Sequence, residues 1–526
     1  MKLFTPLFIF ISILHAQSTY RNFDLNTNLH APHDNHFICG APTFTEDFIL
    51  QNIEKMRTQY PDEYQRMLLP SALNKTYSVG MTQKFWVNVD DGNGGSKSEE
   101  ITAQLLAKGT RNAIWADVNE ISESNNIDNE SAAEYIAFLE QSTPSTSVDP
   151  TKGAWELITA HFGDEPNYDG DEITDYLFAD LYSGVGGYFS PSDQTNRPGS
   201  NKRDILYVDV NMSKDYAKAV ISHEHQHLIH SNYREKPLTF NEGMSEMAMI
   251  IVGYGAIGFS PNAYLGNVGN IGFDWEGESA NYAFGGLFVL YFAEQLGYES
   301  LLKFQKIDAS GWSAFQQLLN SYDTGLSYKS WIQNFHIANY LNDKTIDPAY
   351  GYDYSLIGNA KTSKWHSSGV VQSEEITIKN FDVNYIYYGA ASDSLPITFT
   401  SKSLVNSYKS LEFNEDTLVI QNLEDNVTHL VKDDNYKVNS SVFVVSNLHA
   451  SDSYYTYKSE GKNIGGWFAT KEIKYDDDDV DLFETATSSF GYLGWGRNAP
   501  GQGWGVEFDP VVKENQLLSV TINMGF

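Results

Sequence analysis

The sequence predicts an α+β protein in which a mixed sheet and a largely helical half come first and β-rich domains follow. Three patterns indicate this class. Residues 84–89 alternate between polar and apolar side chains as a half-buried strand does, whereas residues 213–340 have mainly helical patterning. Beyond about residue 365, short strand-like runs return with turn signals roughly every 8–12 residues, which is typical of all-β domains. We therefore expect helices and strands to be segregated along the chain.

Composition and charge restrict the classes of function. The chain has 526 residues, of which 41% are hydrophobic and 20% charged, so several buried cores are expected. Its formal net charge is −33, and a surface this acidic argues against nucleic acid and against an anionic membrane as partners. The single cysteine excludes an internal disulfide framework and a cysteine-based zinc finger. Any metal site must therefore depend mainly on His, Asp and Glu.

The N-terminus has the pattern of a secretory signal peptide over residues 1–16. Lys2 precedes an apolar run over residues 3–14, and the small residue Ala16 stands at the expected cleavage site. An N-terminal membrane anchor is the alternative, but the run is shorter than the roughly 18–20 residues that span a bilayer. No later segment of the sequence reaches that length. We therefore expect a secreted protein, extracellular or at the cell surface.

The rest of the chain divides into four predicted parts. Residues 17–75 are a propeptide or N-terminal strap with a helical stretch at 44–67, and residues 76–365 form the main domain. Residues 366–460 are predicted to form a β-sandwich-like domain, and residues 461–526 a C-terminal β-rich segment. Because about 65 residues are few for a closed sandwich, the last segment is expected to need the preceding domain.

The elements of the main domain are expected in a definite order. Strands fall within residues 77–115, which a turn-rich stretch interrupts, and a helix follows at 130–142. Residues 153–211 mix short strands with many Gly, Asp and Ser residues. Helices dominate from residue 213 to residue 340, with loops near 253–281.

The most informative pattern is the His-Glu-x-x-His run from His223 to His227. Ser213 suits the N-cap of a helix and Asp215 its first turn, and no Gly or Pro interrupts the run that follows. His223 and His227 are four residues apart, so on a helix they project from one face and can share one tetrahedral Zn²⁺. Glu224 can take a proton from a zinc-activated water as that water attacks a carbonyl group.

A second predicted helix supplies a carboxylate for the same metal. Glu242 follows His227 by fifteen residues and completes a His₂Glu set, which leaves one metal position open as catalytic zinc sites do. Glu246 lies one turn later on the same face, where it can accept a hydrogen bond from a ligand histidine. The alternative is a solvated helix face beside a local histidine cluster. We expect His225 to point away from the pair, and we assign no ligand role to His230.

At these residues the chain resembles the thermolysin-like glutamate-zincins, and among them the hyicolysin family of secreted neutral metallopeptidases. The resemblance rests on residues 223–229, 241–246 and 253–255, which read HEHQHLI, NEGMSE and GYG. It covers roughly residues 80–350. It implies that residues 76–365 form a zincin-like metallopeptidase domain, with a mixed sheet and a helical half that carries the His-Glu-x-x-His helix.

The resemblance also implies a zinc-dependent endopeptidase. The implied zinc ligands and general base are His223, His227, Glu242 and Glu224. Tyr282 could donate a hydrogen bond to the developing oxyanion, and core packing is the alternative for this residue. Residues 206–209 would form the edge strand that pairs with an extended peptide substrate. The Gly-x-Met-Glu-Asn motif of aminopeptidases in this clan is absent, which favours an endopeptidase.

Two further features are less specific. Asn167, Asp169, Asp171 and Asp175 offer oxygen ligands at alternating positions, as calcium loops do, although acidic turns are also common in acidic proteins. Cys39 is the only thiol and lies near the expected mature N-terminus. Because a thiolate is a good zinc ligand, Cys39 could occupy the open zinc position in a latent precursor, which resembles the cysteine switch of other metallopeptidases. A thiol without function is the alternative.

Two other classes of function remain open. The protein could be a secreted surface-binding or adhesion protein whose β-rich domains engage a surface and whose zinc domain is inactive or latent. It could also carry another zinc hydrolase activity or a structural metal site, which would have four protein ligands and no open position for water.

Overall fold

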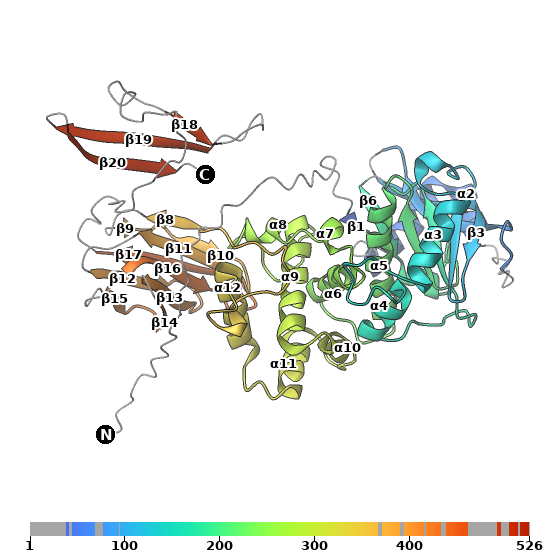
Figure 1. Ribbon diagram of the computed structural model, residues 1–526. Helices are drawn as coiled ribbons and strands as arrows, with labels where there is room; N and C mark the ends of the chain where they lie inside the picture. Colours follow the sequence, from blue (N-terminus) through green and yellow to red (C-terminus); the bar gives the residue numbers. More distant parts are fainter. Residues whose placement is uncertain are drawn as a thin grey trace.

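The computed structural model (Figure 1) shows an α+β protein with a β-rich C-terminal region, as predicted. The described residues are 38–40, 45–68, 77–93, 95–182, 184–366, 371–389, 394–414, 417–432, 438–460, 492–495, 504–513 and 516–524. The predicted signal peptide at 1–16 lies outside these residues. The predicted strap and the predicted C-terminal segment are described only in part.

A seven-stranded mixed sheet lies in the N-terminal half, in the order β1, β6, β7, β5, β4, β3, β2 (Figure 1). The strands are β1 (Ile38–Cys39), β2 (Thr82–Asp90), β3 (Ser96–Lys108), β4 (Asn112–Asp117), β5 (Thr174–Ala179), β6 (Val185–Phe189) and β7 (Ile205–Asp209). Strands β4, β5 and β7 are mutually parallel, whereas β6 is antiparallel to β7. The short strand β1 runs parallel to β6 and closes this side of the sheet.

The expectation that residues 206–209 form the edge strand is wrong. They belong to β7, which pairs with β5 on one side and with β6 on the other. Leu206 and Tyr207 point to opposite faces of the sheet and enter separate apolar cores, so the whole strand is buried. β6 lies further out, and among the described strands only β1 pairs with its outer side.

Helices cover both faces of this sheet. On one face lie α1 (Glu46–Gln59) and α2 (Pro61–Met67), where Met56 and Met67 pack against Trp86 of β2. The single helix predicted at 44–67 is divided in two. Pro61 lacks an amide hydrogen and disfavours a helical conformation at the preceding Tyr60. The other face is covered by α3 (Asn129–Glu140), α4 (Ala154–Phe162) and α5 (Lys214–His230).

The prediction that residues 153–211 mix short strands with many Gly, Asp and Ser residues omits a helix in its first part. Residues 154–162 form α4, which buries Leu157, Ile158 and Phe162 in the core beneath the sheet. A helix of nine residues has little stability of its own, so this packing decides its conformation. The Gly-rich and Asp-rich chain around it concealed the helical pattern.

Residues 213–340 are mainly helical, as predicted. Beyond α5 the helices are α6 (Leu238–Ile251), α7 (Gly255–Gly258), α8 (Asn262–Leu265), α9 (Ser279–Leu296), α10 (Glu299–Gln305), α11 (Gly311–Ser321) and α12 (Tyr328–Leu341). Short 3₁₀ turns occur at Glu123–Asn125, Pro191–Gln194 and Pro348–Tyr350. Helices α6 and α9 approach closely where Gly243 meets Gly285, since a Cβ atom on Gly243 would collide with the Gly285 carbonyl group.

The β-rich region begins with two five-stranded sheets. Their strands are β8 (Lys364–His366), β9 (Val371–Gln372), β10 (Ile376–Ile378), β11 (Val383–Gly389), β12 (Ser394–Ser401), β13 (Ser407–Asn414), β14 (Leu418–Leu423), β15 (Thr428–Lys432), β16 (Val438–Ser446) and β17 (Ser453–Ser459). Ile386 and Phe443 of one sheet share a core with Ile397 and Phe399 of the other. A further antiparallel sheet contains β18 (Tyr492–Trp495), β19 (Trp504–Lys513) and β20 (Gln516–Met524).

The core of the helical half continues into this β-rich region. Val442 and Val444 of β16 belong to the same apolar cluster as the helices α9 to α12, and the Tyr385 hydroxyl of β11 donates a 2.5 Å hydrogen bond to the His336 carbonyl. In Figure 1, α12 accordingly lies against the sheet that contains β11 and β16. The apolar contacts therefore cross the boundary predicted near residue 365.

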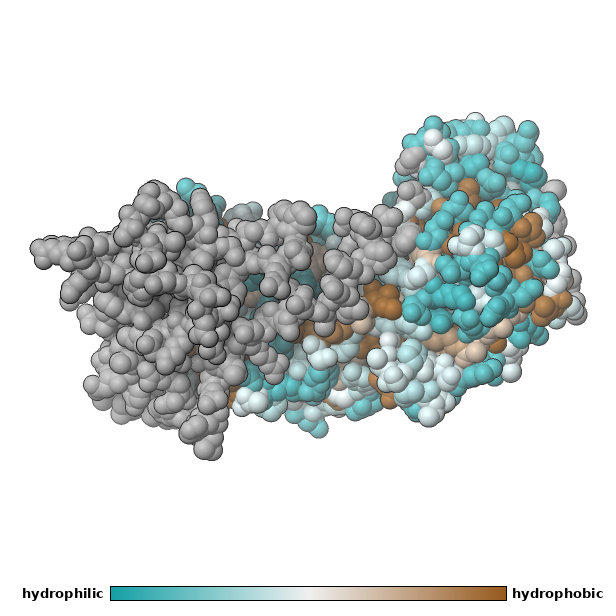
Figure 2. Space-filling view, turned by 45° about the horizontal axis from the view of Figure 1, so that its top comes forward, coloured by the Kyte–Doolittle hydropathy of each residue, from teal (hydrophilic) through white to brown (hydrophobic). Residues whose placement is uncertain are grey.

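The face in Figure 2 is mostly hydrophilic where the structure describes it. In the face shown in Figure 2, hydrophilic residues alternate with small hydrophobic patches. Several large apolar side chains are exposed, among them Val79 and the adjacent pair Leu404 and Val405. In the part of the chain that the structure describes, no helix combines the length and apolar character needed to span a bilayer.

Candidate metal centre

Helix α5 carries the two histidines that the sequence placed on one face. The Ser213 side chain accepts a hydrogen bond from the Tyr216 amide and caps the helix, as predicted, and Asp215 lies in the first turn. One turn apart, His223 and His227 place their Nε2 atoms 3.2 Å from each other. Both side chains are buried, so the pair lies inside the protein and not on a solvated helix face.

Helix α6 brings Glu242 to these histidines. Glu242 Oε2 lies 3.1 Å from His223 Nε2, and Oε1 lies 3.3 Å from His227 Nε2. The carboxylate is fully buried. The three side chains proposed as ligands from the sequence therefore converge on one point between α5 and α6.

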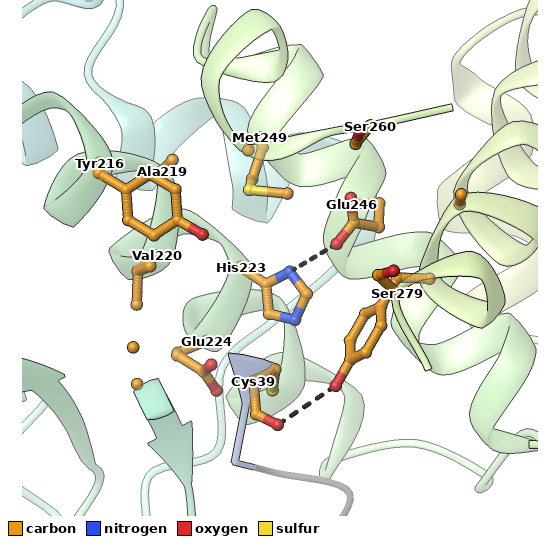
Figure 3. Close-up of a pocket in the computed structure, with 15 residues that line it drawn as sticks. Cys39, Tyr216, Ala219, Val220, His223, Glu224, Glu246, Met249, Ser260 and Ser279 are labelled. Carbon is orange, nitrogen blue, oxygen red and sulfur yellow. Dashed lines mark hydrogen bonds and ion pairs between the residues drawn. The ribbon is translucent and has the colours of Figure 1, made fainter. Parts of the chain in front are cut away.

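The second ring nitrogen of each histidine faces an oxygen acceptor. His223 Nδ1 lies 3.5 Å from Glu246 Oε1 (Figure 3), and His227 Nδ1 lies 3.2 Å from Asn241 Oδ1. An acceptor at Nδ1 favours the ring proton there and leaves the Nε2 lone pair directed inward. Two inward lone pairs repel each other unless a cation lies between them. Sequence reasoning missed Asn241, although its place directly before Glu242 was the available signal.

The spacing of these atoms fits a tetrahedral zinc ion. Two nitrogen or oxygen ligands at about 2.0–2.1 Å from such an ion lie about 3.3 Å apart, and a thiolate at about 2.3 Å lies about 3.5 Å from a nitrogen ligand. Cys39 Sγ lies 3.4 Å from His227 Nε2. The ligand atoms of Cys39, His223, His227 and Glu242 all lie within 4.8 Å of one another. The residues present can thus hold zinc, with a sulfur as a fourth donor.

The electrostatics of the centre favour a buried positive charge. Burial opposes ionisation of Glu242, but the adjacent histidines outweigh it and lower the pKa of this carboxyl to about 2. Burial likewise opposes charge on His227, yet Glu242 raises the pKa of that imidazole to about 9. Burial and the neighbouring Glu242 together raise the pKa of Glu246. A divalent cation can take the place of the imidazole proton beside the carboxylate.

Glu224 lies beside this centre and, together with Cys39 and His223, lines a cavity (Figure 3). Its side chain is 1% exposed, and its Oε2 has no hydrogen-bond partner among the described residues. Burial raises the pKa of the Glu224 carboxyl, although the two histidines act in the opposite direction. A buried carboxylate oxygen without a partner is costly, so we expect a water or a substrate group to bind it.

Strand β6 passes beside the candidate metal centre at Gly187. A Cβ atom on Gly187 would overlap Val220 and the Tyr207 carbonyl and would lie 3.2 Å from Glu224 Cγ. Only glycine therefore lets the strand backbone pass this close to α5. The edge of β6 that faces away from β7 therefore lies beside Glu224, the proposed general base.

Tyr282, at the start of α9, lines the same cavity and does not pack solely in the apolar core. Its ring centroid lies 6.5 Å from that of His223, and its hydroxyl donates a 3.2 Å hydrogen bond to the Cys39 carbonyl oxygen. Burial and the nearby carboxylates raise the pKa of this phenol, so it stays a proton donor. The geometry thus directs a neutral O–H at a carbonyl oxygen inside the site.

The other two histidines of α5 have separate partners. His225 Nε2 lies 2.6 Å from Glu165 Oε1 and its Nδ1 lies 3.1 Å from the Tyr176 hydroxyl. His225 thus faces away from the ligand pair, as expected. His230 interacts with Gln305, and burial lowers its pKa to about 3.

The contacts give little support to calcium binding near Asp169 and Asp171. Asp175 is fully buried and forms a 2.7 Å ion pair with Arg203 and a 2.8 Å hydrogen bond with Trp115. Because the Asp175 carboxylate binds Arg203 and Trp115, it is not directed at a calcium ion, and three of the four predicted oxygen ligands remain. Burial and the neighbouring Asp171 raise the pKa of Asp169 to about 6. Calcium binding at this loop stays a prediction.

Comparison with known proteins gives one distant similarity. No family model matches the chain. The neutral metalloprotease ShpI of Staphylococcus hyicus is 24% identical over 157 residues, a match that covers 26% of this chain and 32% of ShpI. The chain thus spans about a third of the length of the relative it matches. This similarity indicates a distant relationship to a metalloprotease, whereas membership of the hyicolysin family stays a prediction.

Proposed function

We propose that the protein is a secreted zinc-dependent endopeptidase. The observation that carries the proposal is the convergence of His223, His227 and Glu242 at the separations of a tetrahedral zinc site. The partial similarity to a neutral metalloprotease supports the same class of enzyme. Secretion rests on the signal-peptide pattern at residues 1–16.

The residues around the centre suit peptide hydrolysis. Bound zinc would supply a Lewis acid that acidifies a water molecule and polarises a carbonyl group. Glu224 would accept the water proton at Oε2, the atom that has no protein partner, and would pass it to the leaving amine. The Tyr282 hydroxyl would donate a hydrogen bond to the developing oxyanion. Asn241 and Glu246 would hold the two imidazoles in the tautomer that presents Nε2.

The substrate is proposed to be an extended peptide that lies along β6. A strand beside the base offers backbone groups that can bind any sequence, because main-chain hydrogen bonds do not depend on side chains. Gly187 brings this backbone close to Glu224, which aligns a paired peptide with the catalytic groups. The proposed pairing strand is thus β6, and it replaces residues 206–209 in this role.

A structural zinc site is the second candidate, because Cys39 provides a fourth donor and structural sites have four protein ligands. A structural site, however, has no use for a buried carboxylate with an unpartnered oxygen beside the metal. Glu224 therefore favours the catalytic function. A surface-binding protein with an inactive zinc domain would leave Glu224 equally unexplained.

The test measures zinc content and casein hydrolysis together. Because Cys39 lies at the centre, the assay uses the wild type and Cys39→Ala, each with and without Glu224→Gln. We expect hydrolysis by at least one of the two proteins that retain Glu224, its loss on chelation, and its return with zinc. Both Glu224→Gln proteins should bind zinc and be inactive. Bound zinc without hydrolysis in either Glu224 protein would instead support a structural or binding role.

A further inference from the structure

We propose that the segment of residues 38–40 is an internal inhibitor. It would occupy the place of the substrate, with the Cys39 thiolate as the fourth zinc ligand. This inference rests on the proposed peptidase function and adds its regulation. It depends on three independent contacts of one short segment: a sulfur at the metal, a strand pairing on β6 and a carbonyl group at Tyr282.

The first contact is the sulfur at the centre. Cys39 Sγ lies 3.4 Å from His227 Nε2 and belongs to the group of ligand atoms within 4.8 Å of one another. Catalytic zinc sites leave one position open for water, whereas a fourth protein ligand closes it. A thiolate is the strongest of the available donors for this position, because zinc favours sulfur ligands. Coordination by Cys39 would therefore exclude the attacking water.

The second contact is the strand pairing. β1 pairs with β6 in parallel, with Cys39 opposite Gly187, and the Gly40 amide donates a 2.8 Å hydrogen bond to the Gly187 carbonyl. These backbone groups of β6 are the ones that an extended substrate would need. Gly40 fits closely here, since a Cβ atom would lie 2.9 Å from the Tyr182 hydroxyl and 3.0 Å from Val185 Cγ1. The segment thus occupies the recognition strand as well as the metal.

The third contact is at Tyr282. Its hydroxyl donates a 3.2 Å hydrogen bond to the Cys39 carbonyl oxygen. This carbonyl of the inhibitory segment thus accepts the hydrogen bond that a substrate carbonyl would otherwise accept. The cavity that remains beside Glu224 has a volume of about 80 Å³. This space admits water, whereas the place along β6 that an extended peptide would take is already occupied by β1.

The following helices anchor the segment to the domain. Asn52 of α1 donates a 3.0 Å hydrogen bond to Asn88 of β2, and Lys55 forms a 2.6 Å ion pair with Asp91. Met56, buried against Trp86, adds apolar contact to the same helix. An anchored inhibitor binds its site as an intramolecular ligand with a high effective concentration. We therefore expect the full chain to be latent until the segment is displaced or removed.

The direct test compares the full-length wild type with Cys39→Ala, and intact mass confirms that both chains contain residues 38–40. We expect Cys39→Ala to hydrolyse casein on the order of 10²-fold faster than the wild type. A second readout does not depend on activity. In the cobalt-substituted wild type, near-ultraviolet thiolate-to-cobalt absorption should be present and the thiol should resist alkylation, whereas Cys39→Ala should lack the band.

Gly40→Val tests the strand contact without removing the thiol. The added side chain should displace β1 from β6, weaken the cobalt–thiolate band, expose Cys39 to alkylation and raise casein hydrolysis. Asp47→Ala, an exposed position of α1, is the control and should behave as the wild type. Equal hydrolysis by wild type and Cys39→Ala, or no cobalt–thiolate band in the wild type, would overturn the latency proposal and leave the peptidase intact. Inactivity of both proteins with zinc bound would instead contradict the peptidase function itself.

Discussion

Cys39 Sγ lies 3.4 Å from His227 Nε2, although 188 residues separate the two in the chain. The contact joins residues 38–40 to α5, the helix that carries two of the three proposed zinc ligands. A thiolate at this place would close the metal position that a catalytic zinc keeps open for water. The same centre thus contains the groups proposed for catalysis and the group proposed to suppress it, and mutations can separate the two roles.

Glu224→Gln should abolish catalysis without loss of the metal. The amide keeps the size of the side chain but cannot accept the water proton, and general-base catalysis contributes on the order of 10²–10⁴-fold. In a Cys39→Ala background, casein hydrolysis should fall by that factor while zinc content stays at one ion per chain. Glu235→Gln, an exposed position, is the control. Hydrolysis at the parental rate in Glu224→Gln would show that another group is the base.

Glu242→Ala should weaken zinc binding. The change removes a fully buried carboxylate that lies 3.1 Å from His223 Nε2 and 3.3 Å from His227 Nε2. Since loss of even an outer hydrogen-bond partner lowers metal affinity about 10–100-fold, loss of a ligand should cost on the order of 10²-fold or more. Competition with a chromogenic chelator measures the affinity. Unchanged affinity would exclude Glu242 as a ligand.

Tyr282→Phe should lower kcat with little effect on KM. The phenol is directed at a carbonyl oxygen in the site, and loss of one donor to an oxyanion costs on the order of 10²-fold. The measurement is steady-state kinetics on a fluorogenic peptide in the Cys39→Ala background, with zinc content checked. Tyr233→Phe, whose hydroxyl accepts from the Asp164 amide, is the matched control. A rise in KM alone would assign Tyr282 to substrate binding.

Gly243→Val should destabilise the helical half. A Cβ atom at this position collides with the Gly285 carbonyl where α6 meets α9, and the backbone of two packed helices cannot easily shift. We expect the free energy of unfolding to fall by about 3 kcal/mol. Denaturant unfolding should show this loss, whereas Ser313→Ala on the exposed face of α11 should be neutral. An unchanged midpoint would show that α6 and α9 are further apart.

Acid should destabilise the protein through His336. This buried imidazole contacts the Ser446 hydroxyl at 2.9 Å and the Phe381 carbonyl at 3.2 Å, and burial lowers its pKa to about 3. Below the ordinary histidine pKa of about 6.5 the unfolded state binds the extra proton, so stability present above that pH is lost as pH falls toward 3.

The loss at His336 should approach 1.4 kcal/mol per pH unit between about pH 6 and pH 4. Unfolding of the zinc-free protein measures it, so that metal release does not contribute. His336→Gln should show a shallower dependence on pH than the wild type. Parallel pH profiles for wild type and His336→Gln would contradict a neutral buried His336.

The spacing of residues along the sequence was sufficient to predict the part of the site that lies on helices. The spacing of His223 and His227 predicted a shared face, and the structure places both on α5 with Nε2 atoms 3.2 Å apart. The N-cap at Ser213 was predicted correctly because capping depends only on neighbouring residues. The α+β class and the β-rich C-terminal region followed from the change in periodicity along the chain.

Features set by long-range packing could not be obtained in this way. A buried internal strand and an edge strand with apolar residues look alike in sequence, so β7 was mistaken for the edge. Helix α4 depends on packing against α3 and α5, and Pro61 divided a pattern that read as one helix. The sequence left two interpretations of Cys39 open, a zinc ligand and a thiol without function. No local pattern links residue 39 to the histidines.

We propose that zinc and Glu224 together hydrolyse peptide bonds at this centre. The most direct measurement is casein hydrolysis by Cys39→Ala and by Cys39→Ala/Glu224→Gln, each after chelation and after zinc is restored, with zinc content determined in parallel. We predict hydrolysis only by zinc-restored Cys39→Ala, with equal zinc in both proteins. Equal zinc and no hydrolysis by Cys39→Ala, or equal hydrolysis by both, would contradict this role of zinc and Glu224.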